Sequence, residues 1–234
     1  EVWASIFVNP AQFGPGEDLD RYPRQMERDC ELLAREGIAL LFAPSGKEMY
    51  PRPSATSVDL PVLTGGLCGA HRPGHFQGVA LVVAKLFNIV RPDIAVFGAK
   101  DYQQAAVIRR MASDLDFPVR LVTVPTVRED DGLTMSSRNA YLSPDDRRAA
   151  RVVPAALEAG AAAVRGGERN GIAVEAVMAD RVGAEPRARL QYAAAVHPDT
   201  LEPSRDIAGS VLLALAVVIG GVRLIDNTVV EARA

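Results

Sequence analysis

A lysine follows a short apolar run at a point where a helix is predicted to begin. The run Ile94–Phe97 has the composition of a buried strand, and Gly98, which allows close backbone approach, comes directly after it. Lys100 then stands at the start of the predicted helix, where free backbone N–H groups and the helix dipole favour negative charge. The pattern predicts a binding site for an anion such as a phosphate.

Two serines and an arginine form a second group suited to phosphate. Ser136, Ser137 and Arg138 lie in a polar stretch that follows the strand predicted to end near Val124. Hydroxyl groups are neutral donors, and a guanidinium is a charged fork that matches phosphate oxygens. The alternative is that Ser136, Ser137 and Arg138 form an ordinary loop without a ligand and that Lys100 is a solvated surface residue.

An uncharged amide follows the first predicted strand. The turn at residues 9–14 presents Gln12 beside apolar residues. In an open parallel sheet, ligands bind outside the carboxyl ends of the strands. We therefore expect Gln12, Lys100 and the segment 136–138 to lie at the same edge of the sheet.

The histidines and cysteines do not predict a metal site. His71 and His75 flank an Arg-Pro-Gly segment that cannot form the helical His-x-x-x-His zinc pattern, and a loop histidine more often caps or packs than acts as a base. Cys30 and Cys68 have no ligand spacing and no disulfide framework, which favours a reducing, cytoplasmic location. No Gly-x-Gly-x-x-Gly or P-loop pattern occurs, so dinucleotide reduction and Walker-type hydrolysis have no support.

The first half of the chain is predicted to be α/β, because apolar runs alternate there with helical patterns. Strands are predicted at residues 2–8, 38–43, 94–97 and 119–124, and helices at residues 24–36, 76–90 and 101–115. In the first helix, Met26, Cys30 and Leu33 share a face, which predicts that Cys30 packs inward. In the third, Ala105, Ile108, Met111, Ala112 and Leu115 are predicted to face inward. The strands are expected to form a parallel sheet with crossover helices.

A smaller α+β unit is predicted to begin near Val127. Ser143 can cap a helix that starts with Pro144, is interrupted at Pro154 and ends near residues 166–167. A helix at residues 172–182 and strands at residues 189–196, 211–217 and 222–230 follow, and Gly220-Gly221 suits a tight hairpin. The predicted domains are therefore residues 1–126 and a lid at residues 127–234.

Composition narrows the functional classes. The chain has 234 residues, 26 Lys and Arg against 29 Asp and Glu, and a net charge of -3, so no basic footprint for nucleic acid exists. The apolar stretch at residues 211–219 is well short of the roughly 20 residues that span a bilayer, so no membrane partner is expected. The chain opens on Glu1 and a strand pattern, and we expect its true N-terminus to be missing.

Several segments resemble the pantothenate synthetase (pantoate–β-alanine ligase) family at consistent spacing along nearly the whole chain. The matches are Ser5-Ile-Phe-Val-Asn-Pro-Ala-Gln-Phe13, Asp18-Leu-Asp-Arg-Tyr-Pro-Arg24, Arg72-Pro-Gly-His-Phe76, Lys100-Asp-Tyr-Gln-Gln104, Met135-Ser-Ser-Arg-Asn139 and Arg223-Leu-Ile-Asp-Asn227. The resemblance implies a Rossmann-like nucleotidyltransferase domain, in which Met135–Arg138 corresponds to a KMSKS-type signature. It also implies a homodimer through the first domain.

The resemblance further implies an ATP-dependent ligase that works through an acyl adenylate, with Mg²⁺. Pantoate and ATP would give pantoyl adenylate and pyrophosphate, and β-alanine would then give pantothenate and AMP. An attack on a phosphate needs cations and fixed donors rather than a covalent nucleophile.

Specific roles also follow from the resemblance. Catalysis would rest on Lys100, Ser136, Ser137 and Arg138, and ATP binding would add Gly98, Ala99, Asp101, Val127 and Met135. Gly98 and Asp101 would lie along the ribose, and Val127 and Met135 near adenine. Asp101 is the one residue implied near Mg²⁺. Pantoate and β-alanine would contact Gln12, Gln104, Arg72 and His75.

The sequence departs from the family pattern at several points. No His-x-Gly-His signature occurs, and the βα unit that carries it would also pair into the sheet, which leaves an open edge beside residues 2–8. Ala99 stands where the family usually has Glu, which puts one local charge in doubt. Two alternatives therefore stay open: another adenylyltransferase of the superfamily, and a non-catalytic remnant that binds nucleotide.

Overall fold

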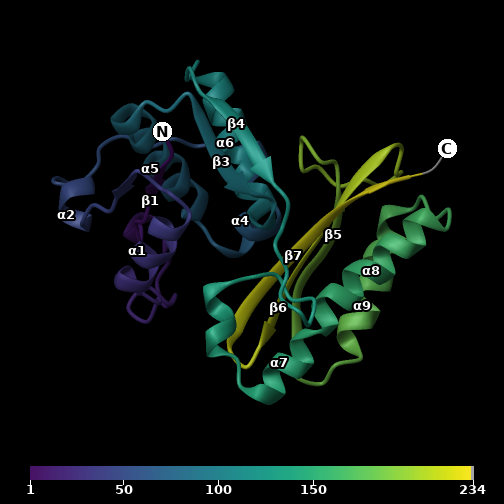
Figure 1. Cartoon of the computed structure of the whole chain (residues 1–234). Helices are drawn as coiled ribbons and strands as arrows, with labels where there is room; N and C mark the ends of the chain where they lie inside the picture. The colour runs from purple at the N-terminus through teal and green to yellow at the C-terminus, as the bar shows by residue number, and fades with distance from the viewer. Residues whose placement is uncertain (233–234) are drawn as a thin grey trace.

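The chain folds into an N-terminal α/β part and a C-terminal part built on a three-stranded antiparallel sheet (Figure 1). The computed structural model describes residues 1–232. We call residues 1–126 the N-terminal part and residues 127–232 the C-terminal part, a division that stays a prediction. The predicted α/β class is confirmed.

The N-terminal part contains the four predicted parallel strands, but they form two separate pairs. They are β1 (Trp3–Ser5), β2 (Leu40–Phe42), β3 (Ile94–Gly98) and β4 (Arg120–Val124). β1 pairs with β2 and β3 pairs with β4, in both cases parallel. The first pair is shorter than predicted, because Pro44 lacks the N–H group that would continue the ladder. Within residues 1–232, the other edge of β1 has no strand beside it.

Two longer helices form the core of the N-terminal part. Its helical elements are η1 (Pro10–Gln12), α1 (Met26–Arg35), α2 (Gly46–Met49), α3 (Pro61–Thr64), α4 (Leu67–His71), α5 (His75–Val90), η2 (Ala99–Asp101) and α6 (Tyr102–Asp114). The predictions for α5 and α6 hold, and the side chains of Ile108 and Met111 in α6 are buried. The short helices α2, α3 and α4 were not predicted, because four or five residues show no helical periodicity.

Two predicted packing positions are wrong. Cys30 is exposed, since α1 buries none of its residues and Met26 is 44% exposed. Leu115 is 53% exposed because α6 ends at Asp114, one residue before it. Amphipathic spacing showed which residues share a face but not whether another element covers that face.

The first α-helix of the C-terminal part begins with the predicted Ser143 cap. The helical elements of this part are η3 (Ser137–Tyr141), α7 (Pro144–Ala150), α8 (Val152–Arg165) and α9 (Gly171–Gly183). The Ser143 hydroxyl accepts a hydrogen bond from the Asp146 N–H at 3.2 Å. The predicted interruption lies at Arg151, not at Pro154. The ring of Pro154 clashes with the backbone carbonyl four residues earlier, so the helix breaks before the proline. Pro154 itself lies in the first turn of α8.

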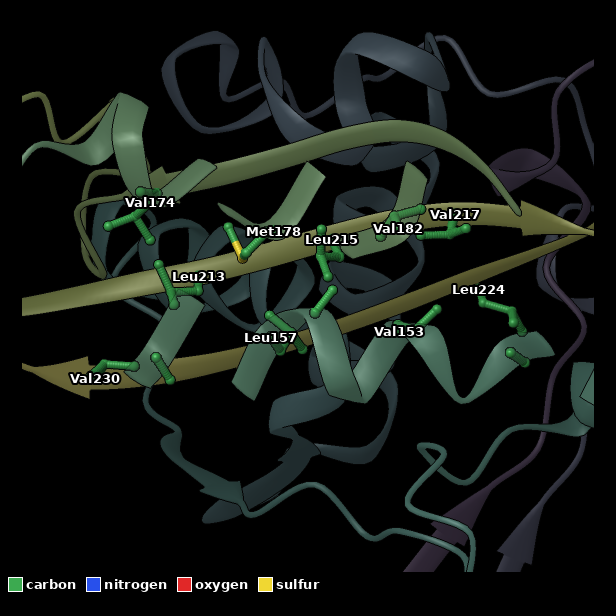
Figure 2. Close-up of a cluster of buried hydrophobic side chains, with 14 of the residues drawn as sticks. Val153, Leu157, Val174, Met178, Val182, Leu213, Leu215, Val217, Leu224 and Val230 are labelled. Carbon is green, nitrogen blue, oxygen red and sulfur yellow. The ribbon is translucent and has the colours of Figure 1, made fainter. Parts of the chain in front are cut away.

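The antiparallel sheet consists of β5 (Ala188–Val196), β6 (Ser210–Ile219) and β7 (Val222–Glu231). Gly220 and Gly221 join β6 to β7 with φ angles of +57° and +78°, as a tight hairpin turn requires. Side chains of α8 and α9, including Leu157 and Met178, pack against Leu213 and Leu215 on one face of the sheet (Figure 2).

The opposite face of the sheet contacts the N-terminal part. Leu212, Tyr192 and Ile225 belong to the same hydrophobic cluster as α5 and α6. The sheet therefore lies between α8–α9 and the N-terminal helices, and this contact places the loops of the two parts next to each other. Among the described residues, no helix has the length and hydropathy needed to cross a membrane.

Candidate active site

A cavity of about 490 Å³ lies between the two parts of the chain. Its wall contains seven of the residues singled out in the sequence, namely Arg72, His75, Lys100, Asp101, Gln104, Ser136 and Arg138. Six others do not line it: Gln12, Gly98, Ala99, Val127, Met135 and Ser137. These seven residues alone are up to 66 positions apart in the chain, from Arg72 to Arg138.

Lys100 and Asp101 lie in the short turn that joins β3 to α6. The β3 strand ends at Gly98, and η2 then leads directly into α6, as the sequence predicted for an anion site. The Lys100 ammonium is 3.7 Å from the Asp101 carboxylate, whose side chain is half exposed. The Lys100 side chain is 22% exposed, so its charge is available to the cavity.

Asn227 of β7 holds the backbone of this turn from the C-terminal part. Its side-chain N–H group donates to the carbonyls of Ala99 and Lys100 at 3.1 and 2.8 Å. The neighbouring Asp226 carboxylate is buried and accepts two hydrogen bonds from Arg128, at 2.7 and 3.0 Å. Burial raises the pKa of Asp226, and the Arg128 guanidinium opposes that rise. The C-terminal sheet thereby fixes the position of Lys100.

Arg138 approaches the cavity from the first turn of η3. The Ser136 hydroxyl accepts a hydrogen bond from the Arg138 N–H at 3.3 Å, which fixes the turn. The Arg138 guanidinium forms two hydrogen bonds with Asp18 of the N-terminal part, at 2.8 and 3.0 Å, and lies 5.6 Å from the centre of the Tyr22 ring. These hydrogen bonds lower the pKa of Asp18, so the carboxylate is charged at neutral pH. The Ser137 hydroxyl contacts the Tyr22 hydroxyl at 3.2 Å.

Arg72 forms the second arginine–carboxylate pair of the cavity. Its guanidinium donates to both oxygens of Glu17, at 2.7 and 2.5 Å, and to the Gln12 carbonyl at 3.3 Å. Burial acts to raise the pKa of Glu17, but the hydrogen bonds from Arg72 prevail and lower it. The segment that carries Glu17 and Asp18 therefore holds both arginines.

The His75 imidazole is neutral and has a defined tautomer. Its Nε2 lies 3.0 Å from Arg72 Nη1, and its Nδ1 lies 2.8 Å from the Gln12 carbonyl. Because arginine can only donate, Nε2 accepts and Nδ1 carries the proton. Burial and then the Arg72 charge lower the pKa of His75 to about 4.

The two predicted glutamines differ in their surroundings. Gln12 lies in η1, which packs so closely on α5 that a Cβ atom at Gly78 would be 2.1 Å from the Ala11 carbonyl. The Gln12 side chain accepts a hydrogen bond from Asn9 at 3.3 Å, and its carbonyl contacts Arg72 and His75. Gln104 lines the cavity, and its amide has no hydrogen-bond partner among the described residues.

Val127 and Met135 lie next to each other outside the cavity wall. The Met135 N–H donates to the Val127 carbonyl at 2.9 Å, and both side chains are largely exposed. Gly98 and Ala99 lie on the β3 side of Lys100, at the end of β3 and in η2.

The described residues suit a magnesium ion that is held mainly by its substrate. Within residues 1–232, no group of three His, Cys, Asp or Glu side chains could hold a metal alone. Mg²⁺ is usually bound through one or two carboxylates together with substrate phosphates. Asp101, half exposed in the cavity wall beside Lys100, is the kind of single carboxylate such an ion needs.

Sequence reasoning missed the carboxylates that hold the arginines and the amide that holds the Lys100 turn. Glu17, Asp18 and Asn227 are all far from their partners in sequence. Asp18 and Asn227 belong to segments noted for their family resemblance, which was the one signal available for them. Nothing in the spacing of Glu17 marks it.

Comparisons with known proteins agree with one another. A family model described as Pantoate-beta-alanine ligase matches residues 1–229. A pantothenate synthetase from Moorella thermoacetica is 56% identical over 230 residues, which are 98% of this chain and 81% of the relative.

Solved structures give the same result. The crystal structure of pantothenate synthetase from Thermus thermophilus has a TM-score of 0.93 at 51% identity and covers 97% of this chain and 82% of that one. A pantoate-beta-alanine ligase from Francisella tularensis, complexed with beta-gamma ATP and beta-alanine, has a TM-score of 0.76 at 32% identity and covers 97% and 79% of the two chains.

Proposed function

The chain belongs to the pantoate-beta-alanine ligase family, and we propose that it uses ATP to condense pantoate with β-alanine through a pantoyl adenylate. The products would be pantothenate, AMP and pyrophosphate. That the chain is a ligase follows from its membership of the family. The nucleotide dependence and the adenylate are the proposed steps.

The observation that supports the proposal is the convergence of cations and neutral donors in one cavity. Lys100 comes from η2, just before α6, and Ser136 and Arg138 come from the start of η3 in the other part of the chain. Attack on a phosphate spreads negative charge over its oxygens, and fixed donors stabilise that charge without forming a covalent bond. ATP would therefore bind with its phosphates between the two parts.

The remaining ATP contacts are assigned from the resemblance to the family. Gly98 and Asp101 would lie along the ribose, Ala99 between them would also contact ATP, and the backbone of Val127 and Met135 would contact the adenine. The Ser137 hydroxyl would leave Tyr22 to reach a phosphate. When bound, Mg²⁺ neutralises phosphate charge, and Asp101 is the residue that would hold it. ATP binding has a parallel in the Francisella tularensis relative, which was crystallised with beta-gamma ATP.

Pantoate would bind to the side of the cavity lined by Gln104, Arg72 and His75, and Gln12, which lies in η1 outside the wall, would also contact it. An amide can donate to a hydroxyl and accept from it, and it does not repel the carboxylate of the substrate. Gln104 suits this role because its amide is unpaired within the described part of the chain. The neutral His75 orients Arg72, whose positive charge would attract the pantoate carboxylate.

The proposed chemistry has two balanced steps. A pantoate carboxylate oxygen attacks the α-phosphorus of ATP, and the bond to pyrophosphate breaks. The amine of β-alanine then attacks the acyl carbon, the bond between acyl carbon and AMP oxygen breaks, and the amine loses a proton. Lys100, Ser136 and Arg138 would stabilise the charge that develops in the first step.

Product analysis tests the proposal directly. The chain is incubated with pantoate, β-alanine, ATP and Mg²⁺, and the nucleotide and acid products are separated by chromatography. We expect pantothenate and AMP in equal amounts. Formation of ADP would contradict an adenylate, adenylation without pantothenate would favour another adenylyltransferase, and ATP binding without products would favour a non-catalytic remnant.

Two further properties are part of the proposal. The free Cys30 and Cys68 support a reducing, cytoplasmic location. A homodimer through the N-terminal part is supported by exposed apolar side chains there, among them Trp3 and Val96. Sedimentation of the purified chain would test the dimer, and a monomer at micromolar concentration would contradict it.

A further inference from the structure

Arg223 of β7 is a partly buried arginine in the cavity wall. Three other cations of the wall lie within 4.0 Å of a carboxylate, in the pairs Arg72–Glu17, Lys100–Asp101 and Arg138–Asp18. Arg21 also has no carboxylate partner in the described chain, but it is exposed and lies over the Tyr141 ring. Within residues 1–232, Arg223 is therefore the one partly buried arginine of the wall whose charge no carboxylate balances.

The hydrogen bonds of Arg223 leave much of its guanidinium free. Nε donates to the side-chain oxygen of Gln191 at 2.6 Å, and Nη2 lies 3.4 Å from the Cys68 sulfur. A guanidinium has five N–H donors, and a thiol sulfur is a weak acceptor. The Arg223 guanidinium also forms a hydrogen bond with the Tyr192 side chain, so three of its contacts are made within the fold. The remaining N–H groups can donate two hydrogen bonds to an anion such as a carboxylate.

A tyrosine hydroxyl joins Arg223 at the same point of the wall. The Tyr192 hydroxyl lies 3.2 Å from the Cys68 sulfur, which Arg223 also contacts. Burial raises the pKa of Tyr192, so the phenol stays protonated and can donate. The His71 ring stacks on the Tyr192 ring at a centroid distance of 5.8 Å and keeps it in place. A charged donor and a neutral donor therefore converge here.

This group lies beside the residues proposed to bind pantoate. The Cys68 N–H donates to the side-chain oxygen of Gln103 at 2.9 Å, and Gln103 precedes Gln104 in α6. Cys68 is in α4, which ends at His71 immediately before Arg72. An anion bound to Arg223 would therefore share the cavity with pantoate without using the groups assigned to the phosphates.

We propose that Arg223, with the Tyr192 hydroxyl, binds the carboxylate of β-alanine. This inference rests on the proposed function. β-Alanine reacts through its amine, so its carboxylate keeps its negative charge throughout and needs a permanent cation. A guanidinium matches a carboxylate in shape and charge, and it cannot lose its proton. The amine at the other end of this short substrate would then point toward pantoate.

Equilibrium dialysis with radiolabelled β-alanine, in the presence of pantoate and a non-hydrolysable ATP analogue, tests the inference without turnover. β-Alaninamide, which keeps the amine and lacks the charge, serves as the competitor. We expect Arg223→Gln to weaken β-alanine binding by about tenfold or more, because hydrogen bonds between charged groups are roughly twice as strong as neutral ones. β-Alaninamide should compete equally well with both proteins, and Arg223→Lys should recover part of the binding.

The matched control is Arg189→Gln, since Arg189 is an exposed arginine on β5 of the same sheet and does not line the cavity. Unchanged β-alanine binding in Arg223→Gln, equal weakening of both ligands, or no β-alanine binding by the parent chain would each overturn the inference. If the parent chain forms pantothenate and the Arg223→Gln variant keeps its β-alanine affinity, this inference alone is contradicted. β-Alanine binding through Arg223 without product formation would contradict the proposed function alone.

Discussion

Replacing His75 by glutamine removes a histidine that the fold keeps neutral, and it should flatten the pH dependence of stability. Burial and the Arg72 charge lower the pKa of His75 to about 4, against an ordinary value of about 6.5. The Glu17 and Asp101 carboxylates and the Gln12 carbonyl favour the charged form, but they do not prevail. Glutamine keeps an uncharged polar side chain at this position.

The sign and size of the effect follow from proton linkage. The folded chain binds fewer protons at His75 than the unfolded chain between pH 6.5 and 4, so its contribution to stability is lost as the pH falls through that window. With the two pKa values above, the loss between pH 7 and pH 5 is about 2 kcal/mol in the parent chain. The His75→Gln variant should lack this component, because it has no group to protonate.

Two measurements check this prediction. NMR titration of the imidazole resonances, with His75→Gln used for assignment among the 3 histidines, gives the pKa directly. Urea unfolding of both proteins at pH 7 and pH 5 gives the difference in unfolding free energy. A His75 resonance that titrates near pH 6.5, or identical pH slopes for parent and variant, would refute the reasoning.

Other predictions concern contacts around the cavity. Asp18→Asn should strengthen ATP binding up to about fivefold in calorimetric titration, because Arg138 no longer has to leave a partly exposed ion pair, and weaker binding would contradict this. Asn227→Ala should weaken ATP binding by about tenfold with an unchanged circular dichroism spectrum, since the carbonyls of Ala99 and Lys100 lose their donor. Unchanged ATP affinity would show that the hydrogen bonds from Asn227 do not contribute to ATP binding. Gln104→Ala should weaken pantoate binding by about tenfold and spare ATP, and an equal loss of both would exclude the assigned role.

Local signals in the sequence predicted the elements well where each element carries its own pattern. The periodicity of α5 and α6, the Ser143 cap and the hairpin at Gly220-Gly221 all depend on residues within a few positions of one another. The buried or exposed state of Cys30 depends instead on whether another element covers α1, and sequence spacing carries no such information.

The sequence predicted the cations of the candidate site but not the carboxylates that pair with them. Lys100 and Arg138 were found because a charged residue after a strand is unusual in itself. Asp18 is 120 residues from Arg138, so the pair exists only through the contact of the two parts of the chain. The same contact brings Arg223 to Cys68, 155 residues away, and no local pattern could have indicated it.

The pantoate-dependent exchange of labelled pyrophosphate into ATP tests the central claim most directly, because it reports adenylate formation in the absence of β-alanine. We predict exchange by the chain with pantoate and Mg²⁺, a strong loss in both Lys100→Ala and Arg138→Ala, and no loss in Lys47→Ala, which removes an exposed lysine of α2. Exchange that is absent from the parent chain, or unchanged in both cavity variants, would contradict the account.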